Sequence, residues 1–223
     1  IKNNIIQSIN KLDDIDYHKI KFIKTKHGDI FHSSNEQHWR LMEYVTDSYT
    51  KDNANNKNDA YEAGRILSLF HILLKDEDLN QYHDTLENFH SLPYRIKEFK
   101  NALEGSNNNL QIECKEEIDY CKRMFDILIV FYNSNLPNRI CHNDSKLNNI
   151  LFNSSNRGLC MIDLDTIMKG YFHYDFGDAI RTIVNPVAEE EKDFSKISFN
   201  KSFFKEFING LKSNGEFLSK DEI

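Results

Sequence analysis

The segment from Arg139 to Ile162 constrains the fold most, because short apolar runs alternate there with polar loops. The runs Arg139–Cys141, Ile150–Phe152 and Leu159–Ile162 have the length and residue types of β-strands. The loop Asn153–Gly158 is rich in Asn and Ser and ends in Gly, which is typical of a hairpin turn. The sequence therefore predicts a small β-structure in which polar loops begin where apolar strands end.

Helical periodicity dominates the remainder of the chain after residue 59. One set of apolar residues recurs at steps of three and four, on one face of a predicted amphipathic helix: Ala60, Ala63, Leu67, Phe70 and Leu74. Similar patterns predict three further helices, at Tyr94–Glu104, Ile118–Tyr132 and Phe203–Leu211. We expect these helices to form the scaffold that holds the short strands.

Residues with β-propensity precede the helices. The sequence predicts a hairpin in which Lys21–Thr25 and Ile30–His32 flank the turn Lys26–Asp29. Trp39–Val45 predicts another strand, and the polar, Asn-rich stretch 47–59 predicts a connection. We therefore expect an α+β fold with two lobes. Residues 1–46 would form a partial N-terminal β lobe with a hinge strand, and residues 47–223 a mostly helical C-terminal lobe with small β hairpins.

Charge and cysteine content disfavour several kinds of partner. The net charge is -7 and no long basic block is present, so the electrostatic footprint of a nucleic-acid-binding protein is missing. The longest apolar run, Met124–Tyr132, is far shorter than the roughly 20 residues that span a bilayer, which predicts no membrane partner. The four cysteines form no CxxC pair, which favours reduced thiols in a cytoplasmic protein. The oligomeric state stays open.

The polar loop after Cys141 carries the pattern HxDxxxxN, from His142 to Asn149. Another carboxylate, Asp163, follows 19 residues after Asp144 at the end of a predicted strand. Phosphoryl transfer requires a carboxylate that orients and deprotonates the attacking hydroxyl, and hard oxygen ligands for magnesium. We therefore assign Asp144 as the catalytic base and Asn149 and Asp163 as ligands of the Mg²⁺ that accompanies ATP. The joint spacing matches the catalytic and metal loops of kinases.

Residues around this pattern are assigned supporting roles. Lys146 is placed to neutralise charge on the transferring phosphoryl group, two residues after the base. His142 is expected to brace the loop rather than titrate, and Asp175 to brace the loop or cap a helix. Taken singly, an Asp such as Asp144 is more often a turn or cap residue, and only the joint pattern favours catalysis.

Two stretches, His142–Asn149 and Ile162–Arg181, resemble the aminoglycoside phosphotransferase and choline kinase superfamily. Within it, the run Tyr174–Arg181 and the acidic run Ala188–Glu191 are most similar to the N-acetylhexosamine 1-kinases. The segment Trp39–Tyr44 also fits that subgroup. The resemblance implies a protein-kinase-like fold and transfer of the ATP γ-phosphate to the anomeric hydroxyl of N-acetylglucosamine or N-acetylgalactosamine.

The resemblance also implies roles outside the catalytic loop. The backbone of four residues would bind adenine as a hinge: Met42, Glu43, Tyr44 and Val45. Asp165 would position sugar or metal. Arg181 would pair with neighbouring carboxylates or with substrate.

The chain also departs from that family. No phosphate-covering loop and no strand lysine paired with a helix glutamate is found before Trp39, and the chain stops at Ile223. We expect a segment truncated at both ends, which by itself binds nucleotide weakly and turns over poorly. Two alternatives stay open: a kinase for an aminoglycoside, choline or another small alcohol, and a nucleotide-binding pseudokinase module. The intact base and metal ligands argue against the second.

Overall fold

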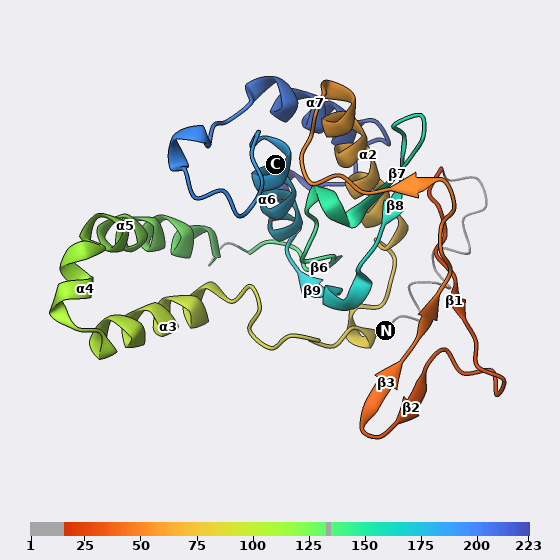
Figure 1. Ribbon diagram of the computed structural model, residues 1–223, viewed down its shortest axis with the longest axis horizontal. Coiled ribbons are helices and arrows are strands. Elements are labelled where there is room, and N and C mark those ends of the chain that lie inside the picture. The colour runs from red at the N-terminus through yellow and green to blue at the C-terminus, as the bar shows by residue number, and fades with distance from the viewer. Residues whose placement is uncertain (1–15, 133–134) are drawn as a thin grey trace. The chain divides into compact units, whose positions relative to one another are not determined.

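The computed structural model describes residues 16–132 and 135–223 (Figure 1). Within these residues the chain divides into two compact units. The first contains residues 16–85 and 138–223, and the second contains residues 86–137. Residues 1–15 of the predicted N-terminal lobe lie outside the described residues. The predicted division into lobes 1–46 and 47–223 stays a prediction.

Two helices form the centre of the first unit. Helix α2 (Lys57–Leu73) begins after Asn56, whose side chain accepts a hydrogen bond from the backbone N–H of Asp59. Helix α7 (Lys201–Lys212) packs against α2. The two backbones approach so closely at Gly64 and Gly210 that a Cβ atom at either position would overlap the opposite helix. Both helices confirm the predictions made from apolar periodicity.

Short strands lie beside this helix pair in the first unit (Figure 1). A three-stranded antiparallel sheet has the order β5 (Ser48–Tyr49), β7 (Ile150–Asn153), β8 (Gly158–Met161). Strand β6 (Arg139–Cys141) pairs with β9 (Met168–Gly170), and α6 (Phe172–Ile183) follows β9. These strands confirm the predicted β-structure and its β7–β8 hairpin. β5 lies inside the stretch predicted to be only a connection, and β9 was not predicted.

The core of the first unit is formed by side chains from the helices and the strands. Among the largest fully buried side chains are Ile66, Phe70, Phe152, Met161 and Phe207. Five short 3-10 helices complete the described residues: η1 (Leu79–Gln81), η2 (Leu147–Asn149), η3 (Leu164–Thr166), η4 (Phe194–Lys196) and η5 (Lys220–Glu222). Of these, η2 and η3 carry predicted site residues.

The N-terminal strands pair differently from the prediction. Strand β1 (Phe22–Ile23) pairs with β4 (Leu41–Met42), and β2 (His32–Ser34) pairs with β3 (Gln37–Trp39). The turn at Thr25–Asp29 exists, because the backbone N–H of Thr25 donates to the Asp29 carbonyl at 2.7 Å, but its flanks do not pair with each other.

The physical reason lies in a second turn, which closes the β2–β3 hairpin. Asn35 and Glu36 are both left-handed, with φ of 51° and 62°, as a two-residue hairpin turn requires. This hairpin also ends at Trp39, so the predicted single strand Trp39–Val45 is wrong and is divided between β3 and β4.

The second unit is helical. It contains α3 (Leu92–Gly105), α4 (Asn108–Glu113) and α5 (Lys115–Tyr132). Phe99 of α3 packs edge-to-face against Phe125 of α5, with ring centroids 5.1 Å apart. The α3 and α5 predictions are confirmed, whereas α4 was not predicted. Among the described residues, no helix is both long and apolar enough to cross a membrane.

Candidate active site

The predicted catalytic loop connects β6 to η2 in the first unit. Asn143 has a left-handed backbone, with φ of 63°, so the chain reverses immediately before Asp144. The Asn143 side-chain amide stabilises this reversal by donating to the carbonyls of Cys141 and Thr166, each at 3.1 Å. The loop is thus folded by its own side chains and by the chain that follows β8.

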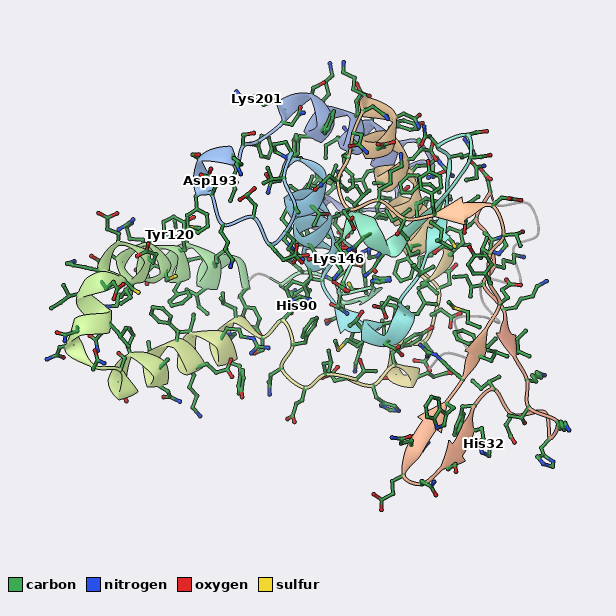
Figure 2. All side chains as sticks on the ribbon, viewed as in Figure 1. His32, His90, Tyr120, Lys146, Asp193 and Lys201 are labelled. Atoms are coloured by element: carbon green, nitrogen blue, oxygen red, sulfur yellow. The ribbon has the colours of Figure 1, made fainter. Side chains whose placement is uncertain are left out.

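Three predicted residues meet at the Asp144 carboxylate. The Asn149 side-chain amide donates to Asp144 Oδ2 at 2.8 Å and to the Asp144 carbonyl at 2.7 Å. Lys146 Nζ lies 3.4 Å from the same Oδ2 atom. Figure 2 shows Lys146 among the strands and helices of the first unit. Asp144 and Lys146 are half-buried, so a carboxylate and an ammonium group reach the surface side by side.

The predicted metal residues are neighbours through the backbone. The N–H of Ile162 donates to the Asn149 carbonyl at 2.8 Å, which brings the following residue, Asp163, beside the catalytic loop. Asp163 is left-handed, with φ of 57°, and its side chain is exposed. Among the described residues, none pairs with the Asp163 carboxylate.

These two residues fit a magnesium ion. Because the Asn149 amide nitrogen faces Asp144, its amide oxygen points away from Asp144 and can accept a ligand bond. Amide and carboxylate oxygens are hard ligands of the type that Mg²⁺ binds, with waters and phosphates supplying the rest. Among the described residues, no group of three or more His, Cys, Asp or Glu side chains could hold a metal ion.

Asp175 of α6 supports the catalytic loop through hydrogen bonds. Its carboxylate accepts the backbone N–H of His142 at 2.8 Å and that of Asn143 at 2.6 Å. Its carbonyl accepts the Ser145 hydroxyl at 2.6 Å. Burial by itself raises the pKa of Asp175, but the His71 imidazole and the His142 contacts outweigh burial, so this pKa lies below its ordinary value. An ionised carboxylate therefore fixes the residues that precede Asp144.

His71 is a supporting residue that the sequence did not single out. Its Nε2 atom lies 2.9 Å from Asp175 Oδ2, and both side chains are buried. This is a close contact between a ring nitrogen and a carboxylate oxygen. The ring stacks on Phe217 and meets Phe172 edge-on. The sequence signal for a role of His71 was its position on the buried face of α2, because a polar side chain that is buried requires a partner.

His142 lies between the two loops, as the bracing role requires. Its Nε2 atom lies 2.8 Å from the Ile162 carbonyl, and its own carbonyl accepts the Thr166 hydroxyl at 2.7 Å. The side chain is fully buried beside Phe70. His142 thus contacts both ends of the metal loop, Ile162–Thr166.

The predicted hinge residues follow β4. The N–H of Glu43 donates to the Lys21 carbonyl at 2.9 Å, and the Val45 carbonyl accepts the Ser48 hydroxyl at 2.7 Å. Among the described residues, none bonds to the Glu43 carbonyl or the Val45 N–H. Met42 and Tyr44 are exposed. The Glu43 carbonyl and the Val45 N–H are therefore among the backbone groups of this stretch that can bind a ligand.

Asp165 and Arg181 pair with different residues in the structure. Asp165 pairs with Arg40, whose Nη2 atom lies 2.6 Å from Asp165 Oδ2. Arg181 pairs with Asp178 at 2.7 Å and with Glu189 at 2.5 Å. Burial raises the pKa of Asp178, the Arg181 contact opposes burial, and the nearby charge of Asp144 adds to the rise.

Arg181 and Lys146 also line one cavity of about 420 Å³. Several neutral hydrogen-bonding side chains share its wall: Asn53, Asn148, Thr182 and Asn185. Three carboxylates complete its polar lining: Asp52, Glu189 and Glu190. Because Lys146 also approaches Asp144, this cavity lies beside the predicted base.

Comparison with known proteins agrees with this arrangement. A family model described as the phosphotransferase enzyme family matches residues 22–195, which is most of the chain. The protein therefore belongs to this phosphotransferase family.

Solved structures show the same fold. A spectinomycin phosphotransferase in complex with ADP and spectinomycin is 14% identical, with 97% of this chain and 64% of that chain covered and a TM-score of 0.62. An amicoumacin kinase bound to AMP-PNP and Ca²⁺ is 13% identical, with coverage of 97% and 62% and a TM-score of 0.55. A microcompartment-associated aminopropanol kinase is 15% identical, with coverage of 99% and 66% and a TM-score of 0.52. These similarities confirm the predicted α+β, kinase-like fold.

This chain spans less than two thirds of the first two of these proteins, at 64% and 62% of their lengths.

Proposed function

We propose that this chain carries the active site of an ATP-dependent kinase that phosphorylates the anomeric hydroxyl of an N-acetylhexosamine. The main support is the joint geometry at Asp144. A half-buried carboxylate lies within hydrogen-bond reach of Asn149, 3.4 Å from Lys146, and beside a loop that carries Asp163. These are the groups that phosphoryl transfer requires, and they come from two separate loops.

In the proposed reaction, Asp144 accepts a hydrogen bond from the acceptor hydroxyl and takes its proton. The acceptor oxygen forms a bond to the γ-phosphorus while the bond to the ADP oxygen breaks. Lys146 stabilises negative charge on the transferring group. Asn149 orients Asp144 and, with Asp163, would hold Mg²⁺, which neutralises phosphate charge when bound.

The hinge stretch supports adenine binding by the backbone. The Glu43 carbonyl can accept a hydrogen bond from an adenine amino group, and the Val45 N–H can donate to a ring nitrogen. The pattern of one acceptor and one donor, two residues apart, suits the edge of a planar base. The proposed N-terminal lobe, residues 1–46, would supply the strand that leads to this hinge.

The cavity beside Lys146 supports a polar, uncharged acceptor. Its two cations are already paired, Lys146 with Asp144 and Arg181 with Asp178 and Glu189. Asn and Thr side chains line another part of the polar wall and suit hydroxyl and acetamido groups.

A second candidate is a kinase for an aminoglycoside, choline or another small amino alcohol. The carboxylates of Asp52, Glu189 and Glu190 favour it, since they would attract a cationic acceptor.

The test is ADP release by the purified full-length protein across a panel of acceptors: N-acetylglucosamine, N-acetylgalactosamine, aminoglycosides, choline and aminopropanol. Preference for the acetylated sugars supports the proposal, and preference for a cationic acceptor supports the second candidate. The matched variant is Asp144→Asn, which should lower kcat by about 10²–10⁴-fold with nucleotide affinity retained. An unchanged kcat would exclude Asp144 as the base, and nucleotide binding without any turnover would favour a pseudokinase module.

A further inference from the structure

The metal loop, Ile162–Thr166, is bound to the catalytic loop at both of its ends. At its start, the Ile162 N–H donates to the Asn149 carbonyl and the Ile162 carbonyl contacts the His142 ring. At its end, the Thr166 hydroxyl donates to the His142 carbonyl at 2.7 Å. These contacts leave the middle of the loop, with Asp163 and Asp165, to be held by other groups.

The middle of this loop requires support. Asp163 is a non-glycine residue in the left-handed region, a strained conformation that persists only where the surroundings fix it. Leu164 is buried and anchors one side. Asp165, on the exposed side, receives the Arg40 guanidinium at 2.6 Å.

Arg40 reaches the loop from the N-terminal strands. It lies between β3 and β4, directly before the strand that leads to the hinge. Its guanidinium carbon lies 5.1 Å from the Phe22 ring centroid, and Phe22 pairs with Met42 across β1 and β4. Stacking on an aromatic ring restricts the Arg40 side chain, which is 29% exposed. Arg40 is therefore held in place before it meets Asp165.

We propose that Arg40 is a positioning residue that joins the hinge strand to the metal loop through Asp165, and thereby holds Asp163 in its metal-binding orientation. The inference rests on the proposed function, since it assigns Asp163 to magnesium. It replaces the expectation that Asp165 itself touches sugar or metal. A change at either Arg40 or Asp165 should therefore loosen the metal loop.

The experiment compares the variants Arg40→Gln, Asp165→Asn, their double variant and the charge exchange Arg40→Asp with Asp165→Arg. Hydrogen–deuterium exchange of backbone amides 163–166 reports the loop directly and needs neither metal nor acceptor. ADP affinity is measured by calorimetry with and without Mg²⁺. The matched control is Lys196→Gln, which removes another exposed ion pair, the one with Glu191 at 3.1 Å.

Each single variant should raise exchange at 163–166 and weaken Mg²⁺-dependent ADP binding by about two- to fivefold, the range expected for an exposed ion pair. The double variant should be no worse than either single variant, and the charge exchange should restore part of the loss. The affinity for ADP without Mg²⁺ should stay unchanged in these variants. In the control Lys196→Gln, both the amide exchange at 163–166 and the affinity for ADP should stay unchanged.

Two results would overturn the proposal. An effect of Arg40→Gln that Asp165→Asn does not share would mean that Arg40 acts on another group, such as a phosphate of the nucleotide. Equal exchange at 163–166 in all variants would mean that the ion pair does not hold the loop. If the unaltered chain binds no nucleotide, the proposed function fails, while the exchange measurement still decides whether Arg40 positions the loop.

Discussion

The two loops of the candidate site are supported by two very different side-chain contacts. Under the catalytic loop, His71 and Asp175 lie 2.9 Å apart with side-chain exposures of 1% and 0%. Beside the metal loop, Arg40 and Asp165 lie 2.6 Å apart with exposures of 29% and 59%. We expect the shorter contact to be the weaker support, because water screens an exposed pair much more than a buried one. The expected strength of each support therefore follows the burial of its side chains and not the distance between them.

The largest effect is expected when the buried support is broken. Asp175→Asn keeps the side-chain size, but removes the charge beside His71 and one acceptor for the backbone N–H groups of His142 and Asn143. We expect a loss of roughly 3–5 kcal/mol in the free energy of unfolding, measured in urea. The control is the exposed Asp84→Asn, which should change stability little. A loss below about 1 kcal/mol would show that the buried pair is not the stronger support.

A double-mutant cycle measures the buried pair itself. His71→Phe keeps an aromatic ring against Phe217 but leaves the Asp175 carboxylate without its imidazole. The cycle of His71→Phe with Asp175→Asn should give a coupling energy of about 1–3 kcal/mol, since the two residues share one interaction. Additive effects in the same unfolding experiment would mean that His71 contributes packing only.

Acid should weaken the protein through its buried or paired carboxylates. Glu222 accepts hydrogen bonds from Arg139 and Ser219; although burial alone would raise its pKa, these contacts lower it to about 2. Because this pKa is below the ordinary 4.5, the stability from Glu222 is fully present above pH 4.5 and is lost as pH falls toward 2. The pKa of Asp175 is also lowered, so its contribution is lost in the same direction.

Unfolding experiments between pH 6 and pH 2 test this prediction. Glu222→Gln should be less stable than the unaltered protein at pH 6, and the difference should shrink as pH falls below 4.5. A difference that stays constant with pH would contradict the assignment of this titration to Glu222.

The smallest effect on stability is expected at the exposed pair. Arg40→Gln should lower the free energy of unfolding by less than about 1 kcal/mol, and about 1 M salt should abolish the difference. The Asp175→Asn effect should persist in the same salt, because a buried pair is screened much less. Equal salt dependence of both variants would remove the distinction between the two supports.

Much of the chain after residue 56 could be predicted because its signals are local. The β6, β7 and β8 strands are short apolar runs between polar loops, and α2 has a long apolar stripe. The spacing from Asp144 to Asn149 and Asp163 identified residues that the structure brings together. Strand β9 was not predicted, because its residues Met168–Gly170 form no apolar run.

Pairing between distant segments was not predictable from the same signals. The N-terminal hairpin was assigned to the turn at Gly28, whereas the left-handed pair at Asn35 and Glu36 closes the hairpin that forms. Asn and Glu at these positions do not mark a turn as strongly as glycine does, so the glycine at position 28 led to the wrong hairpin assignment.

By itself, the sequence predicted the chemistry that we propose for the site: a carboxylate base, an amide and a carboxylate for a metal, and a nearby lysine, at fixed positions along the chain. Only the tertiary structure decided what holds these groups. His71 and Asp175 are 104 residues apart, and Arg40 and Asp165 are 125 residues apart. Local patterns carry propensity and spacing, whereas the strength of each pair depends on burial, which exists only after distant segments have packed together.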